Sequence, residues 1–134
     1  MAERRTKAID DVQALIGSID DLMAAMQTYR QICQNTEAVL QAGRPVVDAL
    51  DHAERTSARS TASDALKQFE EHRHQARMSL VHLASDEGTT SAQFASLMGV
   101  SRQLVERWLK DARAREAAAD GAGPGSRPAT AAAD

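Results

Sequence analysis

The sequence predicts an all-α protein, and three observations favour this class. Alanine, the strongest helix former, occurs 26 times in the 134 residues. Proline occurs only 3 times, so few positions interrupt a helix. Apolar residues recur at spacings of three and four, which is the helical period. Aromatic residues make up 3% of the chain, so we expect a thin core and burial completed by a second subunit.

The first predicted helix covers residues 8–42, where Gly17 is the sole glycine. Flanking apolar residues such as Ile16 and Met23 widen its apolar stripe, and a wide stripe is typical of a helix with two neighbours in a bundle. Gly43 and Pro45 end the helix. We therefore predict a helical hairpin or coiled-coil-like bundle that forms a homodimer, although a purely intramolecular core is the alternative. The predicted dimerisation residues are Val12, Leu15, Ile19, Leu22, Met26, Tyr29, Cys33 and Leu40.

A second helix is expected from Pro45, which suits the first helical position, through about residue 58. The Ser- and Thr-rich run at 56–63 is either a joint or a weakly stabilised continuous helix. A third helix is expected from Asp64 to Glu87. One face of it carries the apolar or long side chains Leu66, Phe69, Arg73, Ala76, Leu80 and Leu83.

Residues 89–110 carry the strongest local signals. Thr90 and Gln93 have capping-box spacing, which predicts a helix starting near Ser91. Gly99 can take a positive φ angle and reverse the chain after this short helix. Ser101 can then cap a new helix.

The apolar residues around this turn predict a three-helix unit. Ala95, four residues before Gly99, leaves room for the second helix to cross closely. Val100 and Val105 can pack as a hydrophobic staple across the helix start. Ala76, Leu80 and Leu83 of the preceding helix are expected to cover the apolar seam. The seam itself consists of Phe94, Met98, Val100, Leu104, Val105 and Trp108.

The run from Ser91 to Lys110 resembles the helix-turn-helix of bacterial DNA-binding proteins. The segment GVSRQLVERWL is similar to those of homeodomain-like and sigma-region-4-like tri-helical units, and the resemblance covers residues 64–115. It implies that the helix starting at Ser101 is a recognition helix that enters the major groove of DNA. The resemblance does not extend to the first 60 residues.

The same resemblance implies which residues touch DNA. Exposed positions of the recognition helix would read bases, where Arg pairs with guanine and Gln with adenine. Thr90 and Ser91 would contact phosphate from the preceding helix N-terminus. Lys110, Arg113 and Arg115 would contact phosphate from later turns. The predicted DNA-binding residues are Thr90, Ser91, Ser101, Arg102, Gln103, Glu106, Arg107, Lys110 and Arg113.

The charge distribution favours the same segment. The whole chain has a net charge of −3. Residues 101–115 hold five basic residues against two acidic ones, which is a local charge of +3. A basic face attracts phosphate even when the whole molecule is acidic.

We divide the chain into a dimerisation region (1–62), a DNA-binding unit (63–115) and a tail (116–134). The tail is rich in Ala, Gly and Pro and has no large apolar residue, so we expect disorder, with its first few residues extending the helix. No run of about 20 apolar residues and no apolar leader segment is present, and the one cysteine excludes an internal disulfide. We therefore expect a cytoplasmic, nucleoid-associated protein.

Neither catalysis nor a cofactor is predicted. The histidines His52, His72, His74 and His82 lack the spacing of a metal site, and Cys33 reads as a small buried apolar residue. No nucleophile–base set or phosphate-binding glycine loop is present. The leading function is a small dimeric transcriptional regulator that binds double-stranded DNA, with no predicted effector. The alternatives are a helical adaptor or partition-type scaffold, and a non-specific nucleoid-architectural protein.

Overall fold

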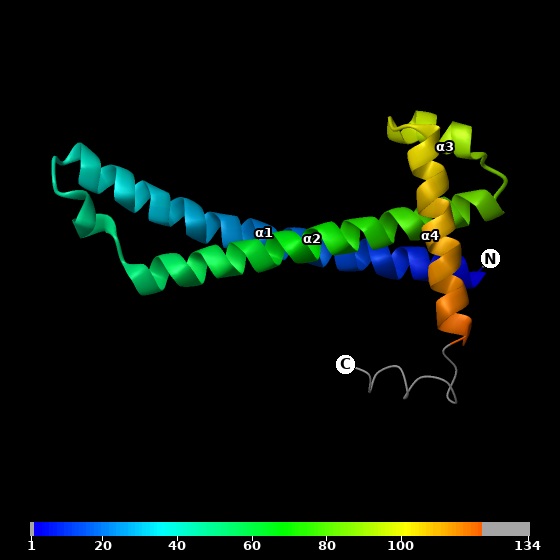
Figure 1. Ribbon diagram of the computed structural model, residues 1–134, viewed down its shortest axis with the longest axis horizontal. Helices are drawn as coiled ribbons and strands as arrows, with labels where there is room; N and C mark the ends of the chain where they lie inside the picture. Colours follow the sequence, from blue (N-terminus) through cyan, green and yellow to red (C-terminus); the bar gives the residue numbers. More distant parts are fainter. Residues whose placement is uncertain (1, 122–134) are drawn as a thin grey trace. The chain divides into compact units, whose positions relative to one another are not determined.

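A computed structural model describes residues 2–121, which form helices without any strand (Figure 1). The elements are α1 (Ala2–Gln41), a short 3-10 helix η1 (Val46–Ala49), α2 (His52–Asp86), α3 (Ser91–Met98) and α4 (Arg102–Gly121). The all-α prediction is therefore confirmed. Of the described residues, 2–10 and 75–121 form one compact unit, here the first unit, and 11–74 form the second unit.

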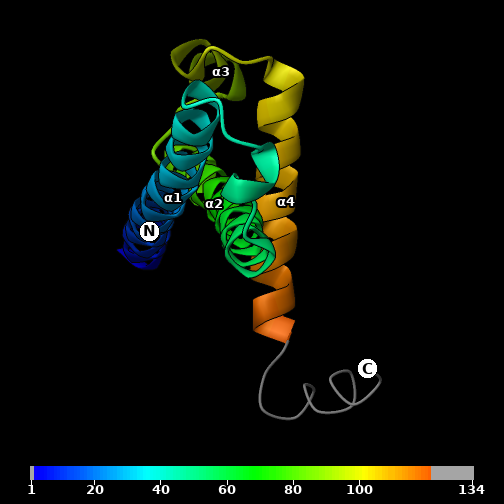
Figure 2. The same ribbon diagram turned by 90° about the vertical axis from the view of Figure 1, so that its left-hand side faces the viewer.

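In the second unit, α1 and α2 lie side by side in both views of the ribbon (Figure 1 and Figure 2). The residues of α1 buried in this contact follow a seven-residue spacing: Asp11, Ser18, Ala25 and Ile32. Ser18 is hydrogen-bonded to Nδ1 of His72 on α2. Most of these side chains are short, which allows two helices to approach closely.

The predicted dimerisation stripe is therefore not the face that α1 turns toward α2. Val12, Leu15 and Leu22 are half-buried, whereas Met26 and Leu40 are exposed. Cys33 is exposed in the single chain, so the predicted burial of Cys33 would require a second subunit. The small residues of α1 occupy the intramolecular contact, and the larger apolar residues remain beside it.

The connection after α1 differs from the expected second helix at 46–58. Residues 46–49 form only one 3-10 turn after Pro45, and Leu50 is extended at φ −100° and ψ 99°. A new helix then starts at His52, where the Asp51 carboxylate accepts a hydrogen bond from the Glu54 N–H at 2.9 Å. Helix α2 continues through residues 56–63, so this run is not a joint, and the third predicted helix begins twelve residues before Asp64.

The core of the first unit is a cluster contributed by three helices. Val81 of α2, Ala95 of α3, and Val105 and Trp108 of α4 are buried together. Phe94, Val100, Leu104 and Leu109 pack around them. The sequence prediction named Leu80 rather than Val81 for α2, but Leu80 is exposed. Ala76 and Leu83 are buried, as expected.

An ion-pair network in the first unit joins the start of α1 to α2 and α4. The Arg4 guanidinium donates two hydrogen bonds to Glu116, at 3.1 and 2.8 Å, and pairs with Asp86. This contact explains one departure from the sequence prediction, because helix α1 begins at Ala2 rather than near residue 8. Helix α4 continues to Gly121, in agreement with the expected extension of the helix into the first few residues of the tail. Residues 116–121 are thus helical, and the rest of the predicted tail lies outside the described residues.

The network also changes the acidity of its members. Hydrogen bonds from Arg4 hold the pKa of Asp86 and the pKa of Glu116 below their ordinary values of 3.8 and 4.5. His82 lies beside the network, and its pKa is lowered from 6.5, first by burial and then by the charge of Arg4. A carboxylate with a lowered pKa stabilises the fold at neutral pH, and this stabilisation is lost as the pH falls through the folded-state pKa.

We predict that Arg4→Met lowers the midpoint of thermal unfolding at pH 7. The difference from wild type should shrink toward pH 3, as Asp86 and Glu116 take up protons. Circular dichroism melts at several pH values measure this. Arg5→Met is the matched control, because Arg5 forms only an exposed pair with Glu87, and exposed pairs contribute little. An Arg4→Met deficit of constant size between pH 7 and pH 3 would contradict the ion-pair explanation.

Candidate nucleic-acid interface

Helix α3 starts with the predicted capping box. The Thr90 hydroxyl accepts a hydrogen bond from the Gln93 N–H at 3.1 Å, and the Gln93 side chain accepts one from the Thr90 N–H at 2.9 Å. Both groups would otherwise lack partners at the helix start. The prediction of a helix beginning at Ser91 is confirmed.

The turn between α3 and α4 depends on Gly99. Its backbone is left-handed, at φ 69° and ψ 33°, a conformation that favours glycine. The Val100 N–H then donates to the Ala95 carbonyl at 3.0 Å, which closes the end of α3. After the turn, the Ser101 hydroxyl accepts a hydrogen bond from the Leu104 N–H at 3.1 Å and caps α4. The predicted glycine turn and serine cap are both confirmed.

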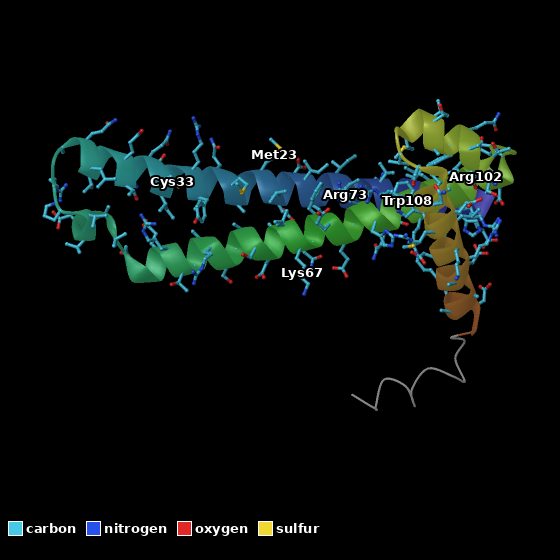
Figure 3. The ribbon with its side chains drawn as sticks, turned by 45° about the horizontal axis from the view of Figure 1, so that its top comes forward. Met23, Cys33, Lys67, Arg73, Arg102 and Trp108 are labelled. Atoms are coloured by element: carbon cyan, nitrogen blue, oxygen red, sulfur yellow. The ribbon has the colours of Figure 1, made fainter. Side chains whose placement is uncertain are left out.

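Helix α4 buries one face and exposes the other. Val105, Trp108 and Ala112, at helical spacings of three and four, are buried. Figure 3 labels Arg102 near the start of α4 and Trp108 further along the helix. We call the exposed residues of the first three turns the outward face of α4. These are Arg102, Gln103, Glu106, Arg107, Lys110 and Arg113.

The outward face of α4 is strongly basic. Four basic residues and one acidic residue give it a formal charge of +3. Arg102 Nε donates to Glu106 Oε2 at 3.2 Å, so the two side chains of opposite charge pair along one turn. Such an exposed pair contributes only about 0.3–0.5 kcal/mol, so a stronger acceptor can displace Glu106.

Three further predicted residues lie at helix starts rather than on this face. Thr90 and Ser101 are exposed, and their hydroxyls accept the capping hydrogen bonds described above. Ser91 is half-buried in the first turn of α3. A capping hydroxyl accepts through its oxygen and can still donate its proton to an outside acceptor such as phosphate.

Two arginines hold α4 against α2. The Arg77 guanidinium lies over the Trp108 ring, 5.1 Å from its centroid. Arg115 donates weak hydrogen bonds to the Gln75 carbonyl at 3.5 Å and to the Ser79 hydroxyl at 3.4 Å. Arg115 therefore contacts α2, unlike the basic residues of the outward face. Sequence reasoning missed the role of Arg77, because nothing local to Arg77 indicates that it meets Trp108.

A small cavity in the first unit is the main competing site. Its volume is about 260 Å³, and its charged lining includes Arg4, Lys7, Arg115, Glu3 and Glu116. Ligand pockets usually enclose about 300–1,000 Å³. Because both signs of charge are present and the volume is small, the lining indicates no particular ligand class.

Other site types find no support in residues 2–121. No three of the His, Cys, Asp and Glu side chains in that range are grouped as metal ligands. In the same range, no helix has both the length and the apolar character that crossing a bilayer requires.

Comparison with family models, with curated proteins and with solved structures finds no match for this chain. The function must therefore be argued from the residues and their geometry. The outward face of α4 is the feature with the most definite chemistry.

We predict that Trp108→Ala destabilises the chain by about 3–5 kcal/mol, the usual cost of removing a buried aromatic side chain. Leu97→Ala should change the stability by less than about 0.5 kcal/mol, because Leu97 is 82% exposed. Urea unfolding followed by circular dichroism measures both values. If the two variants lost equal stability, Trp108 would not be the centre of the α2–α3–α4 core.

Proposed function

We propose that this protein binds double-stranded DNA and that α4 is its recognition helix. The main support for this proposal is the outward face of α4. It has a formal charge of +3 and carries side chains that can form hydrogen bonds to base edges. The opposite face is anchored by Val105 and Trp108, so the reading side chains stand on a rigid element. A helix of ordinary diameter fits the major groove, which is about 12 Å wide.

The proposed roles divide along α4. Arg102 and Gln103 lie in the first turn, where a docked recognition helix meets base edges. Arg can pair with guanine O6 and N7, and Gln with adenine N6 and N7. Arg107 and Glu106 follow in the second turn, where Arg107 can reach base edges and the carboxylate of Glu106 repels phosphate. Lys110 and Arg113 lie further along and suit phosphate contacts, which add affinity without sequence preference.

The start of α3 supplies a second set of phosphate contacts in this proposal. Thr90 and Ser91 combine hydroxyl groups with the positive end of an eight-residue helix. Phosphate groups bind readily at such helix starts. Contacts from both α3 and α4 would fix the register of the protein on the duplex.

The base-reading side chains favour a sequence-selective protein, and hence a transcriptional regulator, over a non-specific nucleoid-architectural protein. The adaptor alternative is favoured by a different observation, the exposed apolar residues Leu97 and Met98 beside the turn. A salt titration on selected and scrambled duplexes separates the three functions. A regulator retains a large affinity ratio, an architectural protein binds both duplexes equally, and an adaptor binds neither.

We predict that Arg102→Ala and Lys110→Ala weaken DNA binding in different ways. On a duplex selected from a random pool by the wild-type chain, Arg102→Ala should cost about 1–3 kcal/mol and relax the preference at one base pair. Lys110→Ala should weaken the selected and scrambled duplexes alike and reduce the salt slope by about one charge. Fluorescence anisotropy over a salt series measures both effects.

Lys67→Ala is the matched control for these substitutions. Lys67 is an exposed lysine of α2 in the second unit, and its loss removes the same charge far along the chain from α4 (Figure 3). We expect it to leave the affinity and the base preference unchanged. The proposal that α4 is the recognition helix would be refuted if the Arg102→Ala and Lys110→Ala variants are folded and bind both duplexes as the wild type does.

We also predict that Glu106→Gln strengthens binding to every duplex by a few-fold. The substitution removes the negative charge of the outward face and releases Arg102 from its intrahelical pair. Affinity should rise most at low salt, where the repulsion between carboxylate and phosphate is least screened. Loss of affinity on one selected duplex, with a gain on scrambled DNA, would instead assign Glu106 to cytosine recognition.

A further inference from the structure

The hairpin of the second unit has two grooves between α1 and α2, and they differ in chemistry. One groove is lined by Leu22, Met26 and Tyr29 of α1 together with Ala62 and Leu66 of α2, and Arg59 and Ser63 complete its lining. The groove on the other side is lined largely by polar residues, among them Asp21, Thr28, Thr61, Asp64 and Gln68. The first groove is therefore lined by large apolar side chains, and the second mainly by short or polar ones.

Helix α1 extends the apolar surface well beyond the first groove. Ile16 and Met23 are 53% and 65% exposed, and Met23 points away from α2 (Figure 3). These two residues are seven apart, as are Ile19 and Met26. Two apolar columns with this spacing are the pattern of a helix that packs against another helix. We call the whole surface the apolar face. It consists of Val12, Ile16, Ile19, Leu22, Met23, Met26, Tyr29, Cys33, Leu40 and Leu66.

The second unit has little core of its own. Among its described residues, the buried apolar side chains are Ala25, Ile32 and Ala58. Ordering a residue costs about 1–2 kcal/mol of backbone entropy, and three side chains, two of them alanine, offset only a small part of that cost. The hairpin therefore needs further apolar burial, and the apolar face is where that burial is available.

The side of the hairpin that carries the apolar face has the dimensions of a stable interface. Val12 and Leu40 are 28 residues apart, which is about 42 Å along a helix. Two helices side by side are about 20 Å wide, so the side of the hairpin that carries this face has a footprint of roughly 800 Å². A standard protein interface buries about 800 Å² on each partner. One further hairpin of the same size would cover the face.

We propose that the occupant is a second copy of this chain, whose apolar face packs on the first to give an intermolecular four-helix bundle. The two apolar columns hold no charged residue between Val12 and Met26, so two copies meet there without repulsion between like charges. Each copy supplies the area that the other lacks. This inference does not rest on DNA binding.

The interface inferred here differs from the dimerisation stripe expected from the sequence. Ile16, Met23 and Leu66 join it, because they are exposed on the apolar face. Leu15 is half-buried and does not line the apolar groove. The centre of the interface therefore moves around α1, away from α2.

The test compares Met23→Glu with Gln31→Glu in the full chain by sedimentation equilibrium. Both substitutions add one negative charge to an exposed site on α1, but Gln31 does not lie on the apolar face. Met, Gln and Glu have similar helix propensities, so both variants should retain their helicity in circular dichroism. The wild type and Gln31→Glu should form dimers of twice 14.4 kDa at tens of micromolar. Met23→Glu should raise the dissociation constant by about 100-fold or more, because the interface would bury an unpaired charge.

Two results of the sedimentation experiment would overturn the proposal. One is a wild-type chain that sediments as a monomer at about 100 μM, which would leave the face for a different partner. The other is an equal effect of the two substitutions. A third measurement needs no variant: the midpoint of thermal unfolding of the wild type should rise with protein concentration, as it does when folding and association are coupled. A midpoint independent of concentration would contradict the dimer.

Discussion

Val105 and Trp108 determine which side of α4 faces outward, and the position of every side chain on the outward face depends on this constraint. Val105 is fully buried, and Trp108 is the largest side chain of the core. Once these two residues pack on Val81 and Ala95, the rotation of α4 about its axis is fixed. The four basic residues of the outward face are then exposed together on the first three turns of α4. Gly99 and Ser101 also fix the position of α4, because Gly99 forms the turn after α3 and Ser101 caps the first turn of α4.

The sequence was most informative where structure is encoded by neighbouring residues. The capping box of Thr90 and Gln93, the left-handed Gly99 and the Ser101 cap each depend on hydrogen bonds over a few positions, and all were predicted. Two of the three buried residues of α4, Val105 and Trp108, were also predicted, because they are large apolar residues at helical spacing. The outward-face residues were named from the resemblance to helix-turn-helix proteins, and the structure leaves their side chains exposed.

Contacts between distant segments were the part that periodicity could not predict. Val81 of the core was missed because this part of α2 is buried on more than one side, with Met78 and His82 buried as well, and a single three-and-four stripe does not describe it. The stripe on α1 was traced through its largest apolar residues, whereas Ser18 and Ala25 make the close contact with α2. The Arg4 pairs with Asp86 and Glu116 join positions more than 80 residues apart. For that reason the start of α1 at residue 2 was missed.

The most direct test of the central claim is to map the surface that touches DNA. Backbone amide chemical shifts of the isotope-labelled full chain would be recorded during titration with a duplex selected from a random pool. If α4 is the recognition helix, the largest changes in chemical shift should occur at residues 101–113 and at Thr90 and Ser91. The chemical shifts of residues 12–40 should be nearly unaffected. Changes centred on the second unit, or an absence of changes at saturating DNA, would contradict the assignment of α4 as the recognition helix.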